Sequence, residues 1–191
     1  MSKKIEIEIP EGKVAEWKEI NGVTTLVLTE EKDNRPVTER IKTLEDACNE
    51  LGEENVLVQA YRTAEFNTSG NQNDVSDVVA YLKLRVIAEA LNEGWEPHFT
   101  TGEYRCYPWF YLYTQEEIDK MDEEMKKKLW RFGGDSDNGS YCGLACTYSS
   151  FAWPASSVAF SARLAVKSDE LAKYFGQQFI DIWADYMIGK S

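Results

Sequence analysis

Residues 74–94 read DVSDVVAYLKLRVIAEALNEG, and this stretch carries a clear helical period. Its apolar residues recur at three- and four-residue spacing, as on a helix with one buried face: Val75, Val78, Val79, Leu82, Val86 and Leu91. Gly94 is a stop signal, because glycine tolerates the left-handed conformation found beyond a helix end. We therefore predict a long amphipathic helix, packed on a core, over residues 74–94.

Three strands are predicted near the start of the chain. Residues 5–9 alternate isoleucine with glutamate, which is the period of a half-buried strand, and Pro10 ends it. Asn21-Gly22 separates residues 17–20 from residues 23–28. This dipeptide favours a tight type I′ turn, so we expect a hairpin there.

Two shorter helices are predicted between this hairpin and the long helix. Thr43 and Asp46 have the spacing of a capping box, and Gly52 ends the helix that they open. A second helical piece is expected over residues 54–64, followed by a polar loop over residues 67–73.

Downstream, residues 104–113 are dense in aromatic side chains, which favour strands, and Pro108 confines such a strand to an edge. Thr114 with Glu117 is a second capping box, expected to open a charged helix that continues to about Leu129.

A strand is expected over residues 161–166, and Ser168 is expected to cap one last helix. The apolar side of that helix comprises Leu171, Tyr174, Phe175, Phe179, Ile182, Trp183 and Tyr186. Helices and strands are mixed without regular alternation, so the predicted class is α+β.

The chain is acidic and shows no secretory or membrane-spanning pattern. Its formal net charge of -12 repels nucleic-acid phosphates, whose binding depends on lysine and arginine. No basic patch followed by an apolar stretch opens the chain, and no run reaches the roughly 20 apolar residues of a membrane span. We expect one soluble domain over residues 1–191, without nucleic-acid binding, signal peptide or membrane insertion. We expect it in the cytoplasm after synthesis, with association with a virion left open.

Catalytic and metal-binding patterns are sparse. The cysteines are Cys48, Cys106, Cys142 and Cys146. The last two have three residues between them, rather than the two of zinc and redox motifs, and His98 is the only histidine. An enzyme would have to use Cys142 with His98, or the carboxylates of Asp135 and Asp137. We favour a non-catalytic protein without a metal site or cofactor.

The composition changes between Gly133 and Ala162. Serine, alanine, glycine, tyrosine, phenylalanine and cysteine dominate, whereas lysine, glutamate, glutamine, methionine, arginine and histidine are absent. A flexible linker fits poorly, because the segment holds the apolar residues Leu144, Tyr148, Phe151, Trp153, Val158 and Phe160. Two interpretations remain. One is a buried sheet, in which small residues let backbones approach closely; the other is a recognition surface, for which tyrosine, serine, glycine and asparagine are typical.

This region also contains Phe132-Gly133-Gly134, Asn138-Gly139-Ser140, the aromatic stretch 148–160 and Ser161-Ala162-Arg163-Leu164-Ala165. Together these motifs resemble the variable repeat of diversity-generating retroelement target proteins. In that family, adenine-directed mutagenesis turns AAC codons into NNC, which excludes lysine, glutamate, glutamine, methionine and tryptophan. The resemblance implies a C-type-lectin-like fold that displays residues 133–166 as a variable, ligand-binding repeat.

The resemblance also divides the segment into scaffold and contacts. Trp153 cannot arise from an NNC codon, so we assign it to the scaffold with Gly133, Gly134, Gly143 and Arg163. The expected ligand-binding residues are Asp137, Asn138, Ser140, Tyr141, Tyr148, Ser150, Phe151, Ser156, Ser157 and Phe160.

Two functional hypotheses follow. The first is a hypervariable protein of a phage or prophage that recognises a receptor or host surface, its partner being an unidentified protein or glycan. Display as a homo-oligomer would raise its avidity. The second is an acidic, phage-encoded interaction protein or inhibitor of a host enzyme, acting through residues 119–124 without diversification. Residues 107–117 and 179–185 also resemble proteins of gut Bacteroidales genomes and their phages, a group that implies no chemistry.

Overall fold

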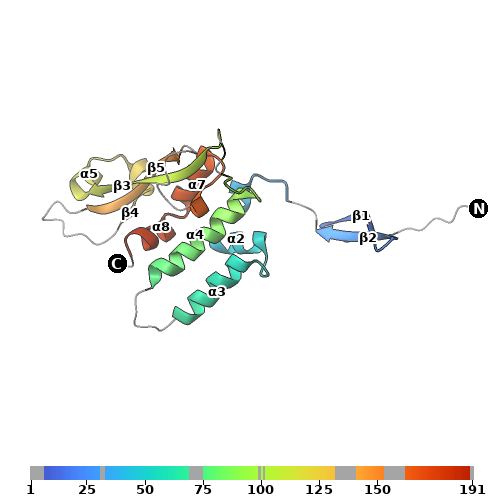
Figure 1. The fold of residues 1–191 in the computed structure, drawn as a ribbon. Helices are drawn as coiled ribbons and strands as arrows, with labels where there is room; N and C mark the ends of the chain where they lie inside the picture. Colours follow the sequence, from blue (N-terminus) through green and yellow to red (C-terminus); the bar gives the residue numbers. More distant parts are fainter. Residues whose placement is uncertain are drawn as a thin grey trace, which may run out of the picture. The chain divides into compact units, whose positions relative to one another are not determined.

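The computed structural model describes residues 7–30, 33–68, 75–98, 100, 102–131, 141–152 and 162–189. The chain divides into two compact units, residues 1–36 and residues 37–191, where the sequence led us to expect one. Each unit is described by itself. Helices and strands are mixed in the second unit, in agreement with the predicted α+β class (Figure 1).

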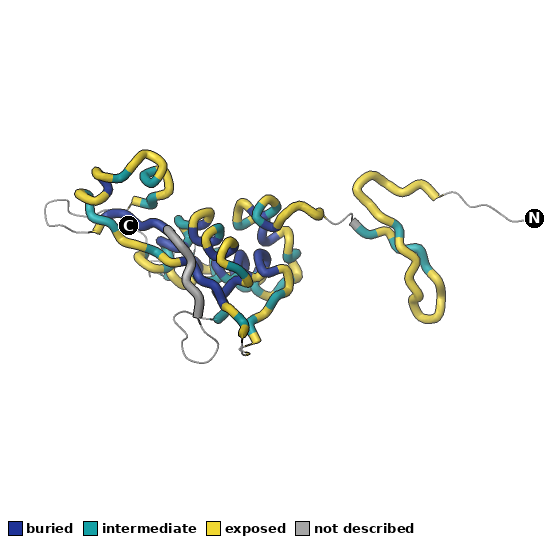
Figure 2. Tube along the Cα trace, turned by 90° about the horizontal axis from the view of Figure 1, so that it is seen from above, coloured by how far each residue is buried: buried dark blue, intermediate teal, exposed yellow. Residues whose placement is uncertain are grey.

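The first unit contains the predicted hairpin. Strands β1 (Lys13–Ile20) and β2 (Val23–Glu30) pair antiparallel, with Ile20 opposite Val23. The turn residues Asn21 and Gly22 both have positive φ angles, 53° and 77°, as a type I′ turn requires. No described residue of this unit is buried (Figure 2).

The strand predicted over residues 5–9 is wrong for its described part. Ile7 and Ile9 are exposed and belong to no strand, and residues 5 and 6 lie outside the described residues. Their alternating pattern predicts a half-buried strand, but the described residues supply no partner strand or core for it.

The second unit opens with four helices: α1 (Val37–Arg40), α2 (Leu44–Leu51), α3 (Val56–Thr68) and α4 (Ser76–Asn92). The capping box before α2 is confirmed, since Thr43 and Asp46 each accept the other's backbone N–H. Gly52 ends α2 with a φ of 82°. The long helix α4 is confirmed, and α3 begins and ends a few residues later than expected. Residues 69–73 of the predicted polar loop lie outside the described residues.

A three-stranded antiparallel sheet follows, in the order β3-β5-β4. Its strands are β3 (Arg105–Thr114), β4 (Trp130–Arg131) and β5 (Tyr141–Ala152). β3 lies at an edge of this sheet, as Pro108 predicts. At its first residues, a single bridge joins Cys106 to Val166 on the other side.

The charged helix predicted from Thr114 to Leu129 is two short helices, α5 (Gln115–Asp119) and α6 (Glu123–Lys127). Its capping box is confirmed, but Asp122 caps a second helix of its own by accepting the Met125 N–H at 2.7 Å. The strand predicted over residues 161–166 is also wrong. Its described part is the 3-10 helix η2 (Ala162–Leu164) followed by the bridge at Val166.

The last predicted helix is divided in two at Phe179, into α7 (Asp169–Gln178) and α8 (Ile180–Met187). Ser168 caps α7 as expected, by accepting the Leu171 N–H. Figure 1 shows α4 between the α2/α3 pair and α8, with the sheet beyond α7 and α8. α4 supplies more of the buried apolar side chains than any other element.

Candidate functional site

Two parts of residues 133–166 are described, β5 and residues 162–166, and β5 lies at the centre of the sheet. The side chains of residues 142–146 are buried between β3, β4, α5 and α7. A Cβ at Gly143 would lie 2.8 Å from Ile118 Cδ1 and 2.9 Å from Leu129 Cδ2. The buried-sheet interpretation therefore accounts for Gly143, because a Cβ there would push against the side chains of Ile118 and Leu129.

The predicted contact residues fall into three groups. Tyr141 is 55% exposed at the start of β5. Tyr148, Ser150 and Phe151 lie in the backbone of β5, paired with Trp109, Tyr107 and Cys106. The other six lie outside the described residues: Asp137, Asn138, Ser140, Ser156, Ser157 and Phe160. The structure thus brings four predicted residues onto one strand, and Tyr141 is the one whose described side chain reaches solvent.

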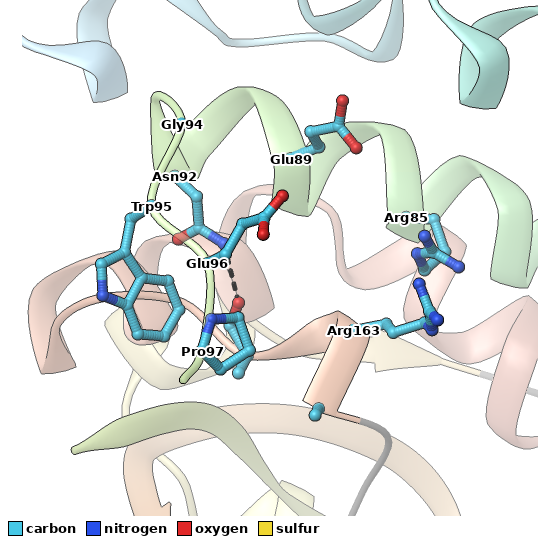
Figure 3. A pocket seen from close by; sticks show the side chains of 10 residues that line it. Arg85, Glu89, Asn92, Gly94, Trp95, Glu96, Pro97 and Arg163 are labelled. Atoms are coloured by element: carbon cyan, nitrogen blue, oxygen red, sulfur yellow. Dashed lines mark hydrogen bonds between the residues drawn. The ribbon is translucent and has the colours of Figure 1, made fainter. Parts of the chain in front are cut away.

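A pocket of about 450 Å³ lies at the other end of the candidate segment. Its lining comes from α4, from the turn that follows α4, and from η2 and Ala165. Figure 3 shows the labelled side chains around it. The C-terminal end of residues 133–166 therefore forms one wall of a cavity that the sequence did not predict.

The turn after α4 forms a second wall of this pocket. Glu93 and Gly94 have φ angles of 50° and 85°, which reverse the chain so that the Trp95 N–H bonds the Asn92 carbonyl at 2.9 Å. Asn92 is 6% exposed; its Nδ2 donates to the Ala165 carbonyl at 2.8 Å, and its Oδ1 accepts the Lys167 N–H at 3.1 Å. This buried amide joins the α4 wall to the wall formed by the candidate segment.

The charged side chains of the pocket are unevenly placed. Arg85 and Arg163 point toward one another on one side, whereas Trp95 lies on the opposite side (Figure 3). Glu89 accepts a hydrogen bond from Asn55 Nδ2 at 2.7 Å, and Glu96 lies between the two sides. Guanidinium groups bind carboxylates and phosphates through paired N–H donors, and an indole ring offers a flat apolar face. The lining thus places two arginines and an indole ring around the pocket, together with the two glutamates.

Sequence reasoning missed most of this pocket. It assigned Arg163 to the scaffold and did not single out Arg85 or Trp95. Arg85 follows Lys83 on a helix whose polar side carries several charges, so its sequence context is that of a solvated residue. The sequence around the pocket offers one local pattern, Asn92-Glu93-Gly94, and this pattern predicts only a helix end.

The catalytic alternatives gain no support from the described geometry. Cys142 Sγ lies 3.8 Å from Gln115 Oε1, and the His98 backbone N–H donates to Glu103; neither contact joins Cys142 to His98. Asp135 and Asp137 lie outside the described residues. No group of three histidine, cysteine or acidic residues within the described ranges could hold a metal ion.

The buried thiols make a prediction about pH. Burial raises the pKa of Cys106 to about 12, with a further contribution from a hydrogen bond to Asp169, and burial raises the pKa of Cys146 to about 11. An unfolded thiol titrates near pH 8.5, so above that pH the unfolded chain binds fewer protons than the folded one. We expect the contribution of these two thiols to the free energy of unfolding to be constant below about pH 8.5 and to fall from there to pH 11.

Urea titrations between pH 7.5 and pH 10 test this prediction, with Cys146→Ala as the comparison. The variant loses some stability at every pH through its smaller side chain, but its decrease above pH 8.5 should be shallower. Parallel decreases for both proteins would show that the Cys146 thiol is not the group responsible.

The acidic alternative rests on residues 119–124, where lysines offset part of the charge. Lys120 pairs with Glu116 at 2.6 Å, and Lys126 pairs with Glu123 at 3.0 Å. Exposed ion pairs of this kind add little stability. Their lysines nevertheless interrupt the negative charge of the surface on which the acidic alternative depends.

Comparison with known proteins adds no assignment: no protein-family model, curated protein or solved structure matches the chain. Of the helices that the structure describes, none is both long enough and apolar enough to cross a membrane.

Proposed function

We propose that this chain is a non-catalytic ligand-binding protein whose binding surface lies in residues 133–166. The observation that carries the proposal is the pocket, because Ala162, Arg163 and Ala165 of this segment line it together with Arg85 and Trp95. A cavity with converging polar groups and an aromatic wall is the usual form of a ligand site.

The exposure of β5 is consistent with this division of roles. Residues 142–146 are buried and would serve as fixed scaffold, whereas the neighbouring Tyr141 is exposed and would serve as a contact. Tyrosine provides a large, rigid contact area at a low cost in conformational entropy. In this proposal the segment is a variable repeat of a phage or prophage protein that recognises a host surface. The C-type-lectin-like resemblance supplies the precedent for a fixed scaffold that carries variable side chains.

The pocket also narrows the chemistry of the ligand. Arg85 and Arg163 favour a carboxylate, and Trp95 favours a flat ring or sugar face beside it. We therefore propose a protein or glycan ligand that presents an acidic group to this pocket, with Tyr141 and its neighbours contacting a wider surface.

Benzoate is a suitable probe for the pocket, because it combines a carboxylate with a ring; benzamide is its neutral counterpart. We expect benzoate, but not benzamide, to shift the indole N–H signal of Trp95 in NMR spectra. Arg85→Ala and Arg163→Ala should each weaken binding about tenfold or more, since a charge-assisted hydrogen bond contributes about 1.5–3 kcal/mol.

Arg131→Ala is the matched control, because it removes an arginine that bonds Gln115 and lies outside the pocket lining. Binding that survives both pocket substitutions, or that does not distinguish benzoate from benzamide, would contradict the acidic-ligand proposal.

Diversification itself is tested on the gene. The codons of the ten predicted contact residues should end predominantly in C, as NNC codons do, and a near-repeat with AAC codons should lie beside a reverse-transcriptase gene. Absence of this arrangement would refute the variable-repeat part of the proposal and leave the pocket to be judged by the binding experiment.

A further inference from the structure

In the described part of the chain, no strand pairs with the outer edge of β1. β1 and β2 form a sheet of only two strands within the described residues. Several of its apolar side chains are exposed, including Trp17 at 68%, Val23 at 62% and Ile20 at 47%. A two-stranded hairpin is at best marginally stable in water, and an open edge readily accepts another strand.

The turn determines which backbone groups of β1 are free to pair. Ile20 and Val23 close a two-residue type I′ turn, so they exchange both backbone hydrogen bonds across the hairpin. The pairing has no register shift, so Lys18 and Glu16 also point their N–H and C=O groups toward β2. The residues between them, such as Trp17, point their N–H and C=O groups toward the outer edge of β1.

We propose that the outer edge of β1 pairs antiparallel with β1 of a second copy of this chain, with Trp17 opposite Trp17 of the partner subunit. The product is a four-stranded sheet with β2 at both edges. Each Trp17 exchanges both backbone hydrogen bonds with its counterpart, as the outward direction of these groups allows.

Charge and apolar complementarity support this register. It places Glu16 opposite Lys18 of the partner subunit, and Lys18 opposite Glu16 of the partner subunit. It also places Val14 opposite Ile20 of the partner subunit, and the reverse. All four are non-hydrogen-bonded pairs, whose Cα atoms lie about 4.5 Å apart and whose side chains are therefore close.

Neighbouring registers lose this complementarity. A twofold axis at Glu16 places Glu16 opposite itself, and an axis at Lys18 places Lys18 opposite itself; like charges directly opposite one another destabilise a sheet. An axis between two residues pairs outward-pointing backbone groups with inward-pointing ones, so its hydrogen bonds do not form. The register centred on Trp17 avoids all three faults.

Within one copy, Glu16 and Lys18 already form a 3.4 Å ion pair on one face of β1. When two copies pair, each Glu16 faces a Lys18 and each Lys18 faces a Glu16. The four side chains then alternate in charge around the twofold axis. The chain as a whole carries -12, which opposes association, and this local neutrality explains how the edge itself avoids the repulsion.

Light scattering coupled to size-exclusion chromatography of the full chain tests the proposal over a range of concentrations. We expect a concentration-dependent dimer. Glu16→Lys and Lys18→Glu should each weaken it by about tenfold or more, because each change turns both Glu16–Lys18 contacts into repulsions. The double variant E16K/K18E restores opposite charges in both contacts and should restore the dimer.

Glu11→Lys is the matched control, since it changes the net charge as Glu16→Lys does but lies in the turn before β1. It should leave the dimer intact. A second readout uses Trp17→Cys, which should form a disulfide between two copies under mild oxidation, because about 5.5 Å separates the Cα atoms of such a pair.

Three results would overturn the proposal. A monomer at every concentration would mean that another segment covers the edge, such as residues 7–9, which precede the turn at Pro10–Lys13. A dimer unaffected by both single charge changes would place the interface elsewhere. Failure of the double variant to recover would show that Glu16 and Lys18 do not face each other. None of these results bears on the pocket.

Discussion

Replacing Trp183 with alanine is expected to lower the free energy of unfolding of residues 37–191 by about 3–5 kcal/mol. Trp183 is 2% exposed on α8. Its ring centroid lies 5.0 Å from that of Phe175 on α7 and 5.2 Å from that of Phe110 on β3. One side chain therefore joins both C-terminal helices to the sheet, and its removal leaves a large cavity at their junction.

Trp183→Phe separates the loss of volume from the loss of a polar group. Trp183 Nε1 is buried and has no hydrogen-bond acceptor among the described residues. Phenylalanine removes this unsatisfied donor and keeps a ring in contact with Phe175, so it should cost about 1–2 kcal/mol. Urea unfolding followed by circular dichroism measures both variants. Trp17→Ala is the control, because Trp17 is 68% exposed in the other unit and should barely affect this transition.

Equal losses for alanine and phenylalanine would contradict this account. They would mean that the indole itself, rather than the volume of a ring, holds the three elements together.

Features with a local cause were predicted well from sequence. Both capping boxes formed, at Thr43 with Asp46 and at Thr114 with Glu117, because capping depends on groups within three residues of each other. The Asn21-Gly22 hairpin formed for the same reason, since its turn depends on two adjacent φ angles.

Breaks within helices could not be predicted in the same way. Residues 169–187 have one continuous apolar face, yet the helix is interrupted at Phe179, where φ is -116° and ψ is 34°. Phe179 is 3% exposed and makes edge contacts with Tyr174 and Phe175. The break accompanies tertiary packing of this ring, which periodicity does not reveal.

The candidate site combines residues that are distant in sequence. Arg85 belongs to α4 and Arg163 to η2, and Asn92 holds the two walls together through Ala165. No local pattern relates positions so far apart. Arg105 is a further example: it is 1% exposed, although arginine in an aromatic strand gives no sign of burial.

The unusual composition of residues 133–162 has two explanations, packing in the sheet and recognition of a ligand. Packing accounts for Gly143, Ala145 and Cys146, which are buried in a central strand. It does not account for Tyr141, which is exposed, and the recognition hypothesis rests on residues of that kind. Burial therefore explains the absence of lysine and glutamate at residues 142–146, and the recognition hypothesis concerns the rest of the segment.

A small residue is also required where α7 meets this sheet. The Gln177 side chain donates to the Cys146 carbonyl at 3.1 Å, which fixes α7 close to β5. A Cβ at Gly176 would lie 2.7 Å from Pro108 Cβ and still closer to Cys146 Sγ. Such contacts involve rigid parts of a strand, so the helix itself would have to move.

Gly176→Ala is therefore expected to destabilise residues 37–191 by about 1–3 kcal/mol, although alanine in a helix normally gains about 1 kcal/mol over glycine. Gly143→Ala is the matched comparison on the same sheet. Its Cβ would meet the flexible ends of Ile118 and Leu129, which can shift, so its cost should be smaller.

A double-mutant cycle identifies the contact responsible. Cys146→Ala removes the sulfur that the new methyl group would strike, so the loss caused by Gly176→Ala should be smaller in that background. The two substitutions should not be additive, with a coupling of about 0.5 kcal/mol or more in urea titrations. If Gly176→Ala stabilises the protein, its helix propensity outweighs the packing, and α7 does not lie as close to β5 as the geometry requires. Additive losses would instead place the conflict at Pro108, which the Cys146 substitution leaves unchanged.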